Sequence, residues 1–171
     1  MNFIDLILAR RSIRKFISDK TVDDEIIKTI IKCGMYAPSA RNQRMWQFVV
    51  ITNKELLNKI AELHPNAGMT KDCSFGILVC ADMNLQKSDG FFQQDLGACV
   101  QNILLAVHSF DLGAVWTGVY PRQDRMNIFI DLFRLPQNII PFAFIPVGYP
   151  NEQKEFPERF EEEKIHFECR R

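Results

Sequence analysis

Apolar residues in the first part of the chain recur at the spacing of an α-helix, and polar loops interrupt them. This period predicts one helix over residues 2–10 and a second that begins at Thr21, as its N-cap, and ends within 34–37, before Pro38. Acidic residues in the first turn of the second helix favour this placement, because the helix dipole stabilises negative charge there.

The rest of the chain alternates between candidate strands and helices. Runs rich in aromatic and β-branched residues predict strands, and apolar stripes at i, i+4, i+7 predict helices. Within the long predicted helix, Gly97 and Ala98 would let another backbone approach closely. The mixed order favours a single α+β layered domain. The predicted strands are 46–52, 75–81, 113–119 and 141–147, and the predicted helices are 53–63 (capped by Asn53), 89–110 and 122–133.

Residues 151–171 form a charged tail with little apolar pattern before 165–167. Such a segment either frays or packs on something outside its own domain. The acidic run at 161–163 is typical of a solvated face and not of a catalytic carboxylate pair. No repeat, linker or low-complexity stretch divides the chain, so residues 1–171 are expected to form one domain.

The composition excludes several classes of partner. With 21 basic and 21 acidic residues, the chain has no net charge that would draw it to nucleic acid or to an anionic membrane. Its basic residues follow the first apolar stretch, which is the reverse of a signal peptide. Its longest nearly apolar run, 139–147, is far shorter than the roughly 20 residues of a membrane span. We therefore expect a soluble, cytoplasmic protein.

Neither a metal site nor a disulfide framework is indicated. The cysteines form no C-x-x-C pair, and we expect them to be reduced core side chains in a reducing compartment. His64, His108 and His166 lack metal-binding spacing, so structural roles are expected for them. Signatures of serine hydrolases, P-loop NTPases and Rossmann dehydrogenases are absent. The cysteines are Cys33, Cys73, Cys80, Cys99 and Cys169.

The segment R-R-S-I-R-K-F at 10–16 gathers cations and a hydroxyl just after the first predicted helix. In one interpretation, the cations only complement the dipole of that helix at the surface. In the other, the guanidinium groups of Arg10 and Arg14 bind a phosphate and Ser12 donates a further hydrogen bond. Taken alone, the segment leaves both interpretations open.

Two further segments offer groups for a flat ligand. The run 37–43 is either an ordinary connector or a source of hydrogen bonds from Ser39 and Asn42. In the run 113–121, Gly118 either ends a strand in a turn or lets a flat ligand approach the backbone. Together with the cationic segment, they indicate a site for a phosphorylated planar heterocycle and favour a flavin-dependent oxidoreductase.

Five segments, in this order, resemble the nitroreductase family of FMN-dependent enzymes over most of the chain. The resemblance implies an α+β sandwich with a central mixed or antiparallel sheet flanked by helices, and an intertwined homodimer with two FMN sites at its interface. The segments are R-R-S-I-R-K-F at 10–16, A-P-S-A-R-N-Q at 37–43 leading to Trp46, D-L-G-A-C-V-Q-N-I-L-L-A at 95–106, G-A-V-W-T-G at 113–118 and I-P-V-G-Y-P at 145–150.

The resemblance also implies which residues bind the cofactor. Arg10 and Ser12, with Arg11 beside them, would hold the phosphate and ribityl end of FMN. Arg159 would complete the phosphate site, and Arg14 would lie near the pyrimidine edge of the flavin, where a fixed cation tunes it.

The remaining implied contacts concern the flavin ring and the second subunit. Thr117 and Gly118 would lie beside the ring. The long helix would form the dimer core, and the tail 151–171 would wrap the other subunit. The partner chain would contribute Pro38, Ser39, Ala40 and Asn42.

The implied activity is electron transfer from NADH or NADPH to an electron-poor acceptor, such as a nitroaromatic or a quinone, by a ping-pong mechanism in which FMN carries the chemistry. The chain departs from the family pattern at Arg44-Met45, where Gln-Pro is common, and at Pro157, where some members carry lysine. A short stretch before the long helix predicts an open, unselective pocket. The alternatives are an FMN-binding storage or sensor protein without nicotinamide turnover, and an interaction module whose basic loop is only surface.

Overall fold

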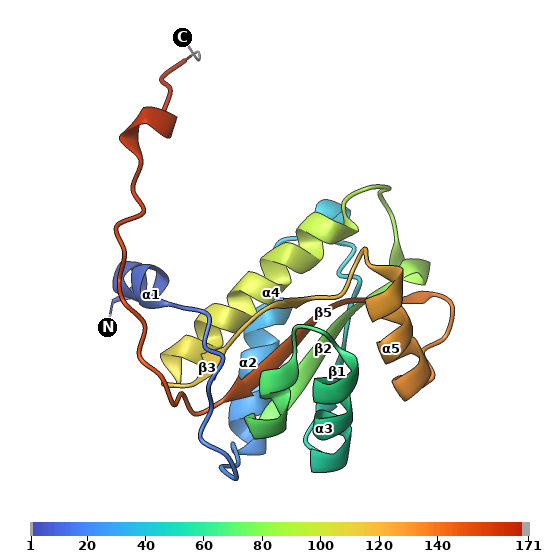
Figure 1. The fold of residues 1–171 in the computed structure, drawn as a ribbon. Helices are drawn as coiled ribbons and strands as arrows, with labels where there is room; N and C mark the ends of the chain where they lie inside the picture. The colour runs from blue at the N-terminus through green and yellow to red at the C-terminus, as the bar shows by residue number, and fades with distance from the viewer. Residues whose placement is uncertain (1, 169–171) are drawn as a thin grey trace.

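The computed structural model describes residues 2–168, which form a three-layer arrangement around one antiparallel sheet (Figure 1). Strand β2 (Phe75–Asp82) lies at its centre and pairs with β1 (Trp46–Ile51) on one side and with β5 (Ile139–Gly148) on the other. The short strands β3 (Gly113–Ala114) and β4 (Thr117–Gly118) pair with the far edge of β5.

Helices cover both faces of the sheet, which explains why β2 is apolar at nearly every position. Alternate residues of β2 point to opposite faces, so Ile77 packs on the side of one helix pair and Leu78 on the side of the other. One pair is α2 (Asp24–Met35) and α4 (Phe92–Ser109), and the other is α3 (Lys54–Leu63) and α5 (Gln123–Phe133).

The predicted helices and strands are confirmed, with two corrections. Thr21 does not cap α2; Asp23 does, and its carboxylate accepts the Glu25 N–H at 2.8 Å. The predicted strand 113–119 is interrupted, because β3 and β4 keep one register along β5 but residues 115–116 are unpaired. That register places Pro146, which has no N–H to donate, opposite Val115.

The two ends of the chain expose apolar side chains. Helix α1 (Phe3–Ala9) has no buried residue, and its Phe3 and Leu8 are 67% and 65% exposed. Beyond β5, the tail leaves the body as an extended arm (Figure 1), on which Phe156 and Phe167 are 71% and 86% exposed. A single chain therefore leaves both segments largely uncovered.

The described cysteines are free thiols, as predicted. Cys73, Cys80 and Cys99 are buried, and burial raises the pKa of each thiol to about 12. Cys169 lies outside the described residues. None of the helices within residues 2–168 combines the length and the apolar character that a bilayer crossing requires.

Candidate functional site

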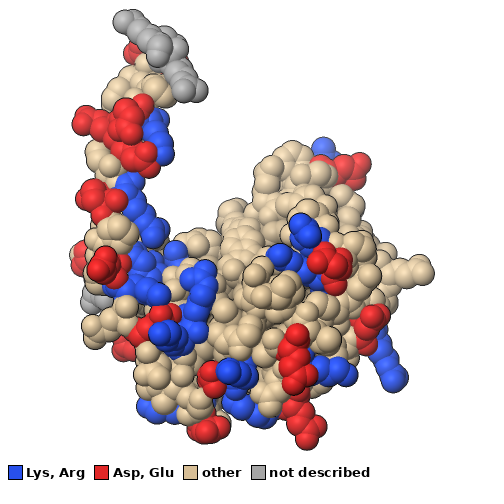
Figure 2. Space-filling view, in the orientation of Figure 1, with Lys and Arg blue, Asp and Glu red and all other residues tan. Residues whose placement is uncertain are grey.

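A cationic pocket of about 580 Å³ lies where the arm joins the body. The first loop contributes Arg10, Ser12 and Arg14 to its walls, and the arm contributes Lys154 and Arg159. Figure 2 shows Lys and Arg side chains gathered at the base of the arm. The structure thus brings the predicted phosphate-binding residues of the loop together with Arg159, which is 145 residues further along the chain than Arg14.

The arginines of this pocket differ from Lys154, which pairs with the Glu152 carboxylate at 2.7 Å. Within residues 2–168, the guanidinium groups of Arg10, Arg14 and Arg159 form no salt bridge. Burial lowers the pKa of Arg10, and the neighbouring charges of Arg11 and Arg159 lower it further. An anion placed between them would relieve this repulsion, so the donor set fits a phosphate group.

Arg11 differs from its neighbours, because its guanidinium is already satisfied by backbone oxygens. It donates to the carbonyls of Leu8 at 2.6 Å, Arg10 at 2.9 Å and Glu155 at 3.1 Å. Its guanidinium also lies over the ring of Phe156, 5.0 Å from the centroid. Arg11 therefore fastens the arm to the first loop, and its predicted part in phosphate binding stays a prediction.

Glu152 is the second fastening between the arm and the loop. Its carboxylate accepts the backbone N–H groups of Arg14 at 2.5 Å and Lys15 at 3.2 Å, and it pairs with Lys154 at 2.7 Å. Burial opposes the charged carboxylate, but Lys154 and these hydrogen bonds outweigh it and leave the pKa of Glu152 lowered. Lys154 also supplies a cation to the pocket that Pro157 lines.

The first loop is held against the sheet by close packing. The Ile13 N–H donates to the Ala114 carbonyl at 3.0 Å, and Ser12 forms a bridge with the same residue. A Cβ at Gly113 would come within 2.7 Å of the Ile13 side chain, so only glycine allows the loop to lie this close. This contact fixes the position of the loop that carries Arg14.

A second pocket, of about 780 Å³, shares Arg14 with the first. The predicted Thr117 and Gly118 line one wall, next to Trp116. The Thr117 hydroxyl donates to the Phe144 carbonyl at 2.7 Å, so its side chain is bound to the sheet. The predicted residues 10, 12, 14, 117, 118 and 159 thus line two adjoining pockets, one cationic and one beside a strand edge.

The opposite wall of the second pocket was not anticipated. It comes from Pro65, Asn66 and the short helix η2 (Gly68–Asp72), which presents Lys71. In the sequence these residues are only a polar connector between a helix and a strand, and nothing there indicates a site. A second cation besides Arg14 therefore lines this pocket, together with one acidic residue, Asp72.

Arg125 and His64 each form a hydrogen bond with a residue that lines this pocket. The Gly118 carbonyl accepts a hydrogen bond from Arg125 Nη1 at 2.8 Å. His64 is 1% exposed, and its Nδ1 accepts the Asn66 N–H at 3.2 Å. Burial lowers the pKa of His64, and the charge of Arg125 lowers it further. A neutral His64 thus lies under both walls of the pocket.

The second predicted loop lies elsewhere. Asn42, together with Tyr36 and Lys87, lines a separate pocket of about 700 Å³. Asp95, near the start of α4, binds Ala40 of this loop, whereas Arg10 and Arg11 lie near His108 at the other end of the helix.

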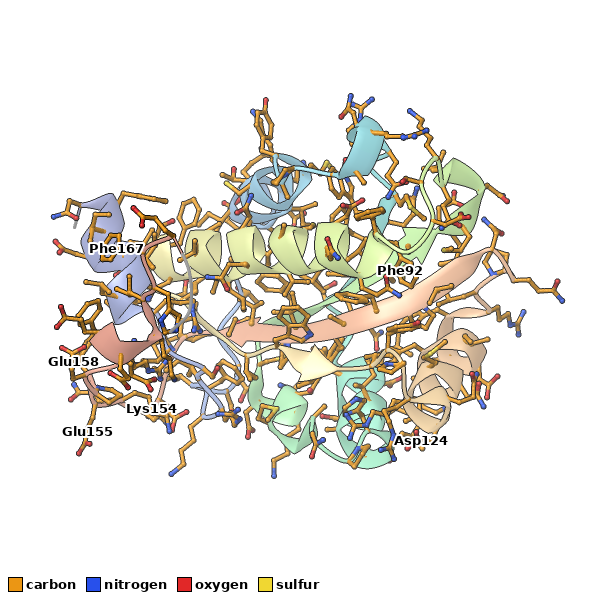
Figure 3. All side chains as sticks on the ribbon, turned by 90° about the horizontal axis from the view of Figure 1, so that it is seen from above. Phe92, Asp124, Lys154, Glu155, Glu158 and Phe167 are labelled. Atoms are coloured by element: carbon orange, nitrogen blue, oxygen red, sulfur yellow. The ribbon has the colours of Figure 1, made fainter. Side chains whose placement is uncertain are left out.

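The length of α4 keeps the two loops apart. Residues 95 and 108 are separated by roughly 20 Å at about 1.5 Å of helix rise per residue. Viewed from above, Lys154 and Glu158 lie at one end of α4 and Phe92 marks the other (Figure 3). One chain therefore does not bring Pro38, Ser39, Ala40 and Asn42 to the two pockets.

Comparison with known proteins gives consistent matches over nearly the whole chain. The family model described as the nitroreductase family matches residues 7–67 and 65–149. A protein of Methanothermobacter thermautotrophicus, provisionally named NADH dehydrogenase/NAD(P)H nitroreductase, is 46% identical over 98% of this chain and 87% of its own length.

Two solved structures share the fold. A Clostridium acetobutylicum protein, provisionally named NADH oxidase, is 38% identical with a TM-score of 0.92, and the match covers 97% of this chain and 100% of the other. A Desulfovibrio desulfuricans protein, solved in complex with FMN, is 28% identical with a TM-score of 0.84 over 99% and 98% of the two chains.

Proposed function

This chain belongs to the nitroreductase family, and we propose that it is an FMN-dependent oxidoreductase that passes electrons from NADH or NADPH to an electron-poor acceptor, such as a nitroaromatic or a quinone. The observation that carries the proposal is a cluster of arginines, without salt bridges among the described residues, around one pocket that shares Arg14 with a second pocket beside a strand edge. A phosphorylated planar cofactor has a phosphate group that suits the cationic pocket and a flat ring that suits the pocket at the strand edge.

The cationic pocket would hold the FMN phosphate. Arg10 and Arg159 supply fixed charge from the loop and the arm, and Ser12 supplies a hydroxyl. Burial and the charges of Arg11 and Arg159 lower the pKa of Arg10, and a dianion bound among these cations would offset their repulsion.

The second pocket would hold the flavin ring. Thr117 and Gly118 offer backbone at one wall, while Arg14 and Lys71 offer cations. When bound, FMN takes up electrons from the nicotinamide and delivers them to the acceptor. The two cations would favour the negative charge that reduction places on the ring edge, which raises its reduction potential.

The site would be completed by a second copy of the chain. Residues 38–42 lie away from both pockets, so they can reach FMN only from a partner subunit. A Cβ at Gly97 would meet a single neighbouring heavy atom, of Trp116, within 4 Å, which leaves room on α4 for a partner helix. The exposed apolar residues of α1 and the arm would then be covered, with 151–171 wrapping the partner.

Donor and acceptor would use the same open pocket in turn, which is a ping-pong mechanism. No nucleophile or general acid is required of the protein, because FMN supplies the chemistry and the side chains bind and tune it. A cytoplasmic location accords with this use of nicotinamide and stays a prediction.

Anaerobic visible spectroscopy tests the proposal. Purified protein, supplied with FMN, should bind about one FMN per chain, with its yellow colour bleached by NADH or NADPH and restored by a quinone. Bound FMN that neither nicotinamide bleaches would instead indicate a storage or sensor protein. Protein that takes up no FMN would refute the flavin site itself.

A further inference from the structure

Two buried polar side chains at the start of α4 connect three segments of the chain. Asp95 is 5% exposed, and its carboxylate accepts the Ala40 N–H at 2.9 Å and the Gln43 side-chain amide at 2.6 Å. Gln43 is 4% exposed, and its carbonyl oxygen accepts the backbone N–H groups of Lys87 at 3.0 Å and Ser88 at 3.2 Å. The pair thus ties the loop 39–44 to α4 and to the connection before it.

The loop that this pair holds has an unfavourable backbone conformation. Arg41, Asn42 and Arg44 have φ angles of 49°, 52° and 45°, in the left-handed region that residues other than glycine seldom adopt. Within the loop, the Ser39 hydroxyl oxygen accepts the Arg44 N–H at 3.1 Å. Such a backbone persists where surrounding contacts determine it, and these conformations gather at functional sites.

We propose that Asp95 and Gln43 are positioning residues that hold this loop in the shape in which it meets the FMN of the partner subunit. The inference rests on the proposed function, because it assumes that residues 38–42 contact that FMN. Asp95 lies on one subunit but acts on the cofactor held by the phosphate site of the other. A change at Asp95 would therefore affect the FMN bound by the partner subunit and not the pockets of its own subunit.

The hydrogen-bond directions make the pair specific. Asp95 can only accept, so the Gln43 amide nitrogen must face it and the Gln43 oxygen must face the two backbone N–H groups. In an Asp95→Asn variant, the new amide opposes a donor, whether Ala40 N–H or the Gln43 amide. Turning Gln43 over moves the conflict to Lys87 and Ser88. The unmatched buried donor displaces the loop.

The exchange of the two groups restores every hydrogen bond. In the double variant Asp95→Asn, Gln43→Glu, the carboxylate introduced at position 43 accepts from Lys87 and Ser88 with one oxygen. Its other oxygen accepts from the amide nitrogen introduced at position 95, and the oxygen of that amide accepts the Ala40 N–H. Gln43→Glu alone sets two carboxylates against each other. Only the combination is expected to behave like the natural chain.

FMN titration of the four proteins tests this cycle, with the flavin reduction potential as a second readout. We expect each single variant to bind FMN about tenfold more weakly, the loss of a hydrogen bond to a charged group, with an altered potential. The double variant should return to within about threefold of the natural chain. The control is the same pair of changes at exposed positions in and just after α5, Asp131→Asn and Gln137→Glu, which should leave binding unchanged.

The outcomes separate the two claims. If the natural chain binds no FMN, the proposed function fails and the inference falls with it. If the natural chain binds FMN and the single variants match it in affinity and potential, while only their melting temperatures fall, the pair is merely structural and the inference is overturned. If Asp95→Asn does not fold, the FMN affinity of Gln43→Glu and its recovery in the double variant decide between the two claims.

Discussion

The loops 10–16 and 37–44 are both polar, and both follow a helix, but they differ in which of their polar groups are paired. Among residues 2–168, no salt bridge neutralises the guanidinium groups of the first, and burial together with the charges of Arg11 and Arg159 lowers the pKa of Arg10. The second also carries two arginines, Arg41 and Arg44, but its costly backbone is fixed by the buried Asp95 and Gln43. The loop 10–16 therefore favours the binding of an anionic ligand. The backbone of the loop 37–44 is already fixed within one chain, before it contacts a partner subunit.

The largest expected effect on FMN affinity comes from a substitution in the loop 10–16. Arg10→Ala should weaken FMN binding by about 1.5–3 kcal/mol, because a charged hydrogen bond to the phosphate is lost. The same change should leave the unfolding free energy of the FMN-free protein undiminished, since it removes repulsion from Arg11 and Arg159. Titration calorimetry and urea unfolding measure the two quantities.

Arg122→Ala is a suitable control for Arg10, because Arg122 is exposed and pairs only with Asp124 at 3.4 Å. It removes the same charge far from the pocket. Equal FMN affinity in Arg10→Ala and Arg122→Ala would show that the cationic cluster does not bind the phosphate.

Gly113→Ala sharpens the comparison by moving the first loop without changing its charges. The new methyl group would overlap Ile13, which lies 2.7 Å from the Cβ position, and overpacking of this kind costs about 1–3 kcal/mol of unfolding free energy. FMN affinity should fall with it, because Ser12 and Arg14 are displaced. A Cβ at Gly68 has no described atom within 4 Å, so Gly68→Ala should leave the unfolding free energy of the FMN-free protein nearly unchanged. Chemical denaturation that ranks the two variants equally would contradict the packing account.

Arg14→Ala should separate the tuning of the flavin reduction potential from the binding of FMN. Because Arg14 lines both pockets, its loss should lower the flavin reduction potential while weakening FMN binding less than Arg10→Ala does. Spectroelectrochemical titration measures the potential. A potential that stays at its natural value would remove Arg14 from the flavin edge.

The smallest effect concerns pH and the Gly118 wall. Burial lowers the pKa of His64 in the folded chain, so below the ordinary histidine range the unfolded state binds more protons. Stability should therefore decrease as the pH falls from about 6.5 toward the folded-state pKa. His108, whose pKa burial also lowers, acts in the same direction. His64→Gln should flatten this dependence, and an NMR titration that finds a raised His64 pKa would contradict it.

Sequence periodicity predicted most of the fold because the core is regular. The long stripe on α4 and the apolar run of β2 each pack against several elements, so their patterns are strong. Thr21 was a wrong cap because Asp23, two residues later, is an equally good capping residue nearer the apolar face. The break between β3 and β4 depends on Pro146, a residue of another strand, which local patterns do not reveal.

The candidate site was only half visible in the sequence. Charged clusters such as 10–14 stand out by composition, and the resemblance to the family linked them to Arg159. Lys71 and the pair of Asp95 with Gln43 were missed, because their roles arise from contacts between segments that are distant in the chain. In the sequence, Asp95 is only one residue of a helical motif. That residues 38–42 lie apart from the pockets follows from the length of α4 and becomes evident only in three dimensions.

The most direct test of a site shared between two chains is complementation in a heterodimer. One chain carries Arg10→Ala with Arg159→Ala, and the other carries Ser39→Ala with Asn42→Ala; each homodimer should bind FMN weakly. In the mixed dimer, one site combines both defects and the other has neither, so we predict one tightly bound FMN per dimer. A mixed dimer that binds FMN no better than its parents would show that each chain builds its site alone, contrary to this account.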